Sequence, residues 1–102
     1  MQHILVVGAG FAGATYAREL AEHGYHVDVI DKRPHVAGNA YDETSDSGVR
    51  VHRYGPHLFH TNNANVVEWL MRFGTFVPYE HRVSVVLAGG AFVPLPINRQ
   101  TI

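Results

Sequence analysis

Three closely spaced glycines, Gly8, Gly10 and Gly13, and a later acidic residue, Asp31, carry the strongest chemical signal in the sequence. The glycines directly follow an apolar run at residues 4–7, and the acid ends a second apolar run. The spacing G-x-G-x-x-G is typical of a turn that binds the diphosphate of a dinucleotide when a strand precedes it and a helix follows. The acid would accept hydrogen bonds from the ribose hydroxyls of an adenosine.

The elements that must position these residues are a strand at residues 4–7, a helix after the glycines and a strand at residues 27–30. Gly8 allows the tight turn off the first strand, and Gly10 has no Cβ to keep a pyrophosphate away from the backbone. Gly13 lets the helix pack closely against the first strand, and the helix N-terminus offers N–H groups to the diphosphate. The alternative is a glycine-rich turn that binds nothing. Three glycines would then lower the stability of the fold without a ligand to explain them.

The composition limits the classes of partner. A chain of 102 residues forms one domain at most, and 8 Lys and Arg against 9 Asp and Glu give no basic surface for nucleic acid. The absence of cysteine excludes disulfides and thiolate metal sites and fits a reducing compartment. No apolar stretch reaches the length that spans a membrane. We therefore expect a cytoplasmic protein that binds neither nucleic acid nor membranes.

The segment after Asp31 departs from a simple nicotinamide-binding unit, in which a crossover helix would follow. Residues 32–62 contain prolines and glycines that forbid a long helix. We predict an irregular cofactor loop, with Arg33 and Asn39 as its polar contacts to a cofactor. Residues 49–52 alternate like a short strand.

The last part of the chain predicts a helix and a hairpin. Apolar spacing favours a helix at residues 63–73, capped by Asn62 or Asn63. A strand at residues 79–87 and a partner at residues 91–95 flank a glycine-containing turn. The predicted fold is α/β: a Rossmann-like dinucleotide-binding βαβ unit, then an irregular cofactor loop, a helix and a β-hairpin.

The sequence closely resembles the N-terminal part of the UDP-galactopyranose mutase family, whose members are flavin-dependent and several times longer. The resemblance covers essentially all 102 residues. Its four blocks are residues 8–13, residues 31–33 with 38–41, residues 54–61, and residues 95–98 with Thr101. Ala37 and Gln100 depart from the family pattern, which favours glycine and asparagine there. We interpret residues 1–102 as an incomplete N-terminal part of an FAD-binding domain, and expect the isolated chain to be inactive.

The resemblance implies an isomerase that interconverts UDP-galactopyranose and UDP-galactofuranose, in the nucleotide-sugar metabolism that serves cell-wall polysaccharide. In that family the FAD must be reduced, and its N5 attacks the anomeric carbon as UDP leaves, giving a sugar–flavin adduct. The ring opens, recloses as the other form, and UDP returns. The cofactor performs this covalent catalysis and the protein positions it. The sequence allows a homo-oligomer.

The resemblance also implies which residues form the site. His57 is the expected catalytic residue, where with Leu58 it would border the isoalloxazine and stabilise negative charge on the reduced flavin. The expected cofactor-binding residues are Gly8, Gly10, Phe11, Ala12, Gly13, Asp31, Lys32, Arg33, Gly38, Asn39, Ala40, His57 and Leu58. Asn98 is the expected substrate contact, with a helix N-cap as its alternative.

Other readings of these residues stay open. His57 is alternatively a structural residue that bonds a loop carbonyl, or a metal ligand with His60. We expect no metal, because no third ligand of matching character is evident. We treat the other six histidines as surface or loop residues, and Trp69 as a core or interface residue.

Three other functions compete with the mutase. An FAD-dependent oxidoreductase of the amine oxidase or desaturase type would share the first two blocks. A nicotinamide-dependent dehydrogenase would need a helix after Asp31. The third alternative is a non-catalytic, truncated FAD-binding fragment. Visible flavin absorbance separates the functions that bind FAD from those that do not.

Overall fold

The computed structural model describes residues 2–95 and residue 99, and the chain divides into two compact units, Met1–His60 and Thr61–Ile102. The first unit holds β1 (His3–Val7), α1 (Phe11–Glu22), β2 (His26–Ile30), the 3-10 turn η1 (Gly38–Ala40), β3 (Asp42–Thr44) and β4 (Arg50–His52). The second unit holds α2 (Ala64–Leu70), β5 (Val83–Val86) and β6 (Phe92–Leu95).

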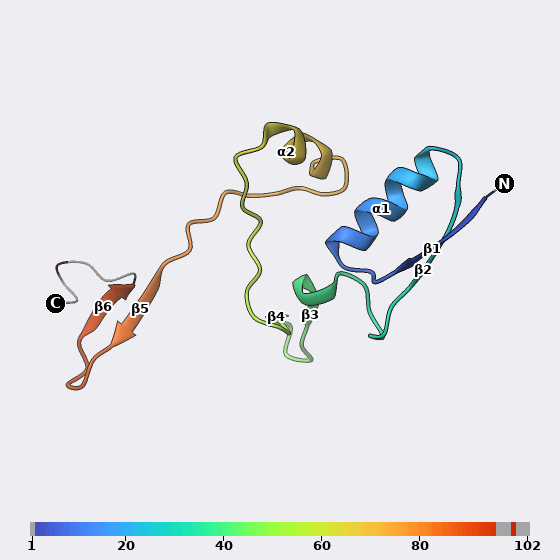
Figure 1. The fold of residues 1–102 in the computed structure, drawn as a ribbon. Coiled ribbons are helices and arrows are strands. Elements are labelled where there is room, and N and C mark those ends of the chain that lie inside the picture. Colours follow the sequence, from blue (N-terminus) through green and yellow to red (C-terminus); the bar gives the residue numbers. More distant parts are fainter. Residues whose placement is uncertain (1, 96–98, 100–102) are drawn as a thin grey trace. The chain divides into compact units, whose positions relative to one another are not determined.

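The first three elements form the predicted βαβ unit. β1 and β2 are parallel neighbours, with His3 opposite His26 and Val7 opposite Ile30, and α1 connects them (Figure 1). Each strand begins one residue earlier than the apolar pattern predicted, because both histidines join the ladder. The α/β, Rossmann-like prediction is confirmed for this part of the chain.

One face of the β1–β2 pair carries α1. Ile4 and Val6 are half-buried, while their neighbours in β1 are exposed. Leu5, Val7 and Ile30 lie on the other face and are 58%, 76% and 50% exposed. Parallel sheets in proteins are covered on both faces. We therefore expect further protein to cover these three apolar residues in a larger fold.

The segment after β2 contains no long helix among its described residues, as predicted, but it holds a hairpin that the sequence reading only half found. β4 lies where the alternation indicated a strand, and its antiparallel partner β3 was missed. Three polar residues, Asp-Glu-Thr, give β3 no apolar alternation. The turn between them closes through Gly48, which adopts a φ of 85°. The Gly48 N–H donates to the Ser45 carbonyl oxygen, 2.8 Å away.

In the second unit, Asn63 caps α2, which decides between the two predicted caps. Its Oδ1 accepts hydrogen bonds from the N–H groups of Asn65 and Val66, at 3.0 and 3.3 Å. The helix ends at Leu70, earlier than predicted, because the Phe73 N–H donates to the Leu70 carbonyl 3.0 Å away in a tighter turn. Trp69 is half-buried against Phe73, at 4.7 Å between ring centroids.

The hairpin of β5 and β6 is shorter than predicted in its first strand, which begins at Val83 rather than at residue 79. Its turn contains Gly89 and Gly90 at φ values of 104° and 87°, which favour glycine. Val93 is buried in this unit. Within the described part of the chain, no helix has the length and hydropathy needed to cross a membrane.

Candidate cofactor-binding site

The glycine turn lies at the carboxyl ends of β1 and β2. The Gly8 N–H donates to the Ile30 carbonyl oxygen at 2.7 Å, and Gly8 adopts a φ of 107°, a conformation that glycine favours. A Cβ placed on Gly13 would lie 1.8 Å from the Gly8 carbonyl oxygen. The fold itself therefore requires glycine at both positions, at one for the turn and at the other for close helix packing.

Gly10 is different, because neither its conformation nor its packing requires glycine. Its φ of −78° is open to any residue. A Cβ at this position would meet only the Gly38 Cα, at an ordinary contact distance of 3.8 Å. The missing side chain therefore leaves space that the described chain does not fill, directly before the first turn of α1. The first N–H groups of a helix have no partners within the helix, so they face this space as donors.

Asp31 joins the end of β2 to the glycine turn. Its Oδ2 accepts from the Ala9 N–H and its Oδ1 from the Arg33 N–H, both at 2.7 Å. These two hydrogen bonds, the one from Ala9 above all, hold the pKa of the Asp31 carboxyl below its ordinary value. Each carboxylate oxygen keeps a lone pair for a further donor, such as a ribose hydroxyl.

The lowered pKa of Asp31 makes a prediction about stability against pH. A carboxylate with a depressed folded-state pKa stabilises the fold above its ordinary pKa of 3.8, and the contribution is lost as pH falls through the folded-state pKa. We expect Asp31→Asn to lower the denaturation midpoint at pH 7, and the difference from the wild type to shrink as pH falls below 3.8 and through the lowered folded-state pKa. Urea titrations at several pH values measure this difference.

The control for this prediction is Asp46→Asn, in the exposed turn between β3 and β4. It should shift the midpoint little at any of these pH values. A gap between Asp31→Asn and the wild type that stays constant throughout the acid titration, until the wild type itself unfolds, would contradict the assigned role of the carboxylate.

The loop after β2 returns to the glycine turn. The Ala37 N–H donates to the Ala9 carbonyl oxygen at 2.8 Å, and a Cβ on Gly38 would lie 3.1 Å from the Gly10 Cα. Ala37 has a φ of 77°, in the left-handed region that disfavours a side chain. This conformation explains physically why glycine would suit position 37.

A polar and aromatic network orders this loop. The Arg33 Nη1 donates to the Asn39 Oδ1 at 2.7 Å, and the guanidinium lies 4.2 Å from the centroid of the Tyr54 ring. The Tyr54 hydroxyl lies 2.7 Å from the His35 Nε2, and the His35 ring stacks on Tyr41 at 3.9 Å. The two predicted cofactor contacts thus bind each other. Sequence reasoning missed the network, because no spacing rule links Tyr54 to this loop.

The other predicted site residues are less closely joined. Phe11 and Ala12 form the exposed first turn of α1, and Lys32 and Leu58 are exposed. The Nδ1 of His57 donates to the Gly55 carbonyl oxygen at 2.9 Å, so its own turn orients the ring. This bond is the one expected if His57 is a structural residue that bonds a loop carbonyl. It leaves the Nε2 of His57 for another partner. Asn98 lies outside the described residues.

A scan of protein-family models gives a match over residues 6–73, described as an NAD(P)-binding Rossmann-like domain. The chain belongs to this family. The matched segment includes β1, α1, β2, the returning loop and α2, and therefore all the contacts of the glycine turn described above.

Curated relatives match the whole chain but only part of their own length. A dTDP-fucopyranose mutase of Escherichia coli is 47% identical, over 100% of this chain and 27% of the relative. A protein of Klebsiella pneumoniae named probable UDP-galactopyranose mutase is 46% identical, over 99% of this chain and 26% of the relative. A probable zeta-carotene desaturase of Synechococcus elongatus is 31% identical, over 85% and 18%. The chain spans about a quarter of the length of the two mutases, which confirms its resemblance to their N-terminal part.

Proposed function

We propose that this chain is the FAD-binding N-terminal part of a flavin-dependent mutase that interconverts UDP-galactopyranose and UDP-galactofuranose. The similarity to two mutases, at 46–47% identity along the whole chain, carries the proposal. Both relatives are named for the rearrangement of a sugar nucleotide. The remainder of a protein of that length would supply the other substrate contacts.

The turn supports a dinucleotide at this site. The space at Gly10 and the helix N-terminus beside it suit a diphosphate, which needs close backbone approach and N–H donors. The lone pairs left on Asp31 suit a ribose. Arg33 and Asn39 lie on the loop that returns to the turn and would hold the cofactor from that side.

FAD fits the returning loop better than a nicotinamide cofactor. A nicotinamide-binding unit normally continues from β2 into a crossover helix, whereas here β2 leads into a loop and the short turn η1. When bound, reduced FAD would supply the nucleophile for sugar transfer. The residues of this chain would bind the cofactor, orient it and stabilise its charge. Visible absorbance of the purified full-length protein tests for bound flavin.

The sugar nucleotide is the point at which the relatives differ. The relative named for dTDP-fucopyranose is as similar as the one named for UDP-galactopyranose, so dTDP-fucopyranose is the second candidate substrate. The test incubates the dithionite-reduced full-length protein with each sugar nucleotide and separates the products by chromatography. A ring-isomer product from the uridine nucleotide supports the proposal, and a product from the thymidine nucleotide alone replaces its substrate.

A similarity to a desaturase keeps an FAD-dependent oxidoreductase as a further alternative. Such an enzyme would pass electrons from its substrate to an acceptor, whereas the mutase reaction has no net redox change. Bound flavin without any isomerisation would favour the oxidoreductase. Absence of both bound flavin and turnover would favour the remaining alternative, a non-catalytic fragment.

His57 gives a test of the proposed chemistry. We expect His57→Ala to slow turnover at least about tenfold and to lower the flavin reduction potential, because a group that stabilises negative charge is removed. The fold should persist, since the side chain is exposed and its described bond is to its own turn. Steady-state kinetics and a redox titration measure both effects.

His60→Ala, three residues further on and also exposed, is the matched control and should keep near-normal turnover. Equal effects of the two substitutions would reduce His57 to a structural loop residue. The cytoplasmic location that we expect, and the homo-oligomer that the sequence allows, stay predictions.

A further inference from the structure

Three side chains that metal ions favour meet at the opposite end of the β1–β2 pair from the glycine turn. His3 and His26 are direct partners in the ladder, and Asp28 lies two residues along β2. Because side chains in a strand alternate between faces, all three lie on the same face. Val6 belongs to the other face, where its Cγ1 would lie 3.4 Å from a Cβ on Gly13 of α1.

The three groups are close enough to share one ion. Their ligand atoms all lie within 4.8 Å of one another, the two imidazole rings are 4.3 Å apart, and the His26 Nε2 is 3.5 Å from the Asp28 Oδ1. Two ligands that each bind zinc at about 2.0–2.2 Å are at most about 4.4 Å apart. Small side-chain rotations would therefore bring the set into coordination.

We propose that His3, His26 and Asp28 bind one divalent transition-metal ion. Two imidazoles and a carboxylate are a donor set that zinc accepts with three protein ligands and water. The His26 and Asp28 side chains are 50% and 63% exposed, so an ion can enter and keep water in its remaining positions. The sequence shows no sign of this site, and from it we expected no metal, weighing only His57 and His60 as ligands. The pairing of His3 with His26 comes from the strand register.

Such an ion would join β1 to β2 where each strand begins. His3 and His26 open their five-residue strands, so at about 3.3 Å per residue these two ligands lie on the order of 16 Å from the glycine turn, and Asp28 lies nearer to it. The ion would therefore act as a cross-link in the sheet and not as a participant in chemistry at the cofactor site. This inference is independent of the proposed function.

Equilibrium dialysis of the untagged full-length protein against Zn²⁺ tests the proposal. We expect one ion per chain, with affinity reduced at least about tenfold in His3→Ala and in His26→Ala. The thermal midpoint should rise with Zn²⁺ in the wild type and not in these variants, because a ligand bound to the folded state stabilises it. Asp28→Asn, which keeps the side-chain size, should also weaken binding and serves if a histidine variant does not fold.

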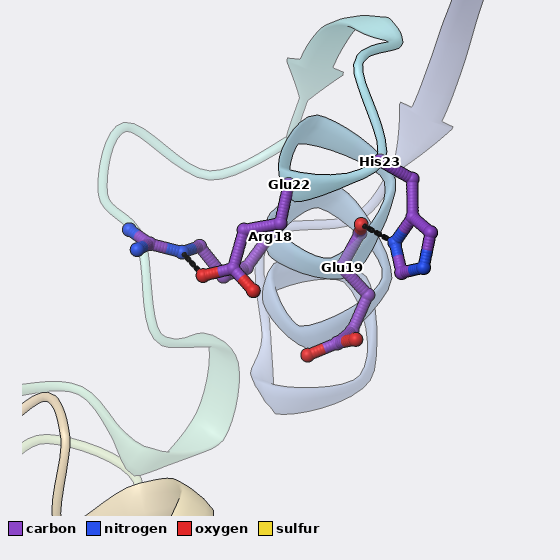
Figure 2. A network of polar contacts seen from close by, with 4 residues as sticks. All are labelled: Arg18, Glu19, Glu22 and His23. Carbon is purple, nitrogen blue, oxygen red and sulfur yellow. Dashed lines mark hydrogen bonds and ion pairs between the residues drawn. The ribbon is translucent and has the colours of Figure 1, made fainter.

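The control is His23→Ala, because Figure 2 shows this histidine turned toward its own helix. Its Nδ1 lies 2.7 Å from the Glu19 carbonyl oxygen, and the Arg18–Glu22 ion pair of 2.6 Å lies on another side of the same helix. Zinc affinity should be unchanged in this variant. Absence of zinc binding, or an equal loss in His23→Ala and His26→Ala, would overturn the proposal.

Discussion

Replacing Gly10 by valine in the full-length protein is expected to abolish flavin binding while the fold is retained. The backbone at Gly10 tolerates a side chain, since its φ is −78° and a Cβ would meet only the Gly38 Cα at 3.8 Å. A valine side chain would instead fill the space proposed for the pyrophosphate. We expect an affinity loss of more than about 100-fold, or about 3 kcal/mol.

The measurement is the flavin-to-protein ratio of the purified variant, with a titration by added FAD. Circular dichroism and the denaturation midpoint establish that the fold is intact. Ala14→Val adds bulk at an exposed position of the same helix, outside the predicted cofactor contacts, and should keep near-normal flavin content. Full flavin content in Gly10→Val would show that the space at the turn is not the diphosphate site.

The βαβ unit could be predicted because local signals agree there. Apolar runs, glycine spacing and the acid after the second strand all indicate the same turn, and the ladder confirms their order. Element ends were less predictable. His3 and His26 extend the strands through backbone pairing, and α2 stops at Leu70 although the apolar spacing continues to Phe73.

Contacts that depend on how distant segments meet were beyond sequence reasoning. Tyr54 reaches Arg33 and His35 only because the chain turns back through the β3–β4 hairpin, and β3 has no pattern of its own. Asp31 could be predicted as a cofactor-binding residue from its place after a strand. Its bond to the Ala9 N–H could not, because this bond depends on how the turn closes. Local pattern thus defines the candidate site, and tertiary pairing determines which groups contact it.

Gly13→Ala should cause a much larger loss of stability than the same added methyl group at Gly10. A Cβ at Gly13 would lie 1.8 Å from the carbonyl oxygen of Gly8 and 2.8 Å from its carbonyl carbon. Both are backbone atoms at the end of β1, so relief requires α1 to move away from the strand. Overpacking of this kind typically costs about 1–3 kcal/mol, and we expect more than about 3 kcal/mol here because no side-chain rotation can remove the overlap.

Gly10→Ala is the matched control, three residues earlier, where the nearest atom would lie at 3.8 Å. Its free energy of unfolding should stay within about 1 kcal/mol of the wild-type value, since no contact is overfilled. Denaturant titrations of both variants without added FAD separate their effect on the fold from any effect on the cofactor. Because Gly13 acts through α1 packing and Gly10 through the space at the turn, Gly13→Ala should lose stability with or without FAD. Equal stability of the two variants would mean that α1 does not pack on the Gly8 carbonyl, and the glycine roles assigned to this turn would be wrong.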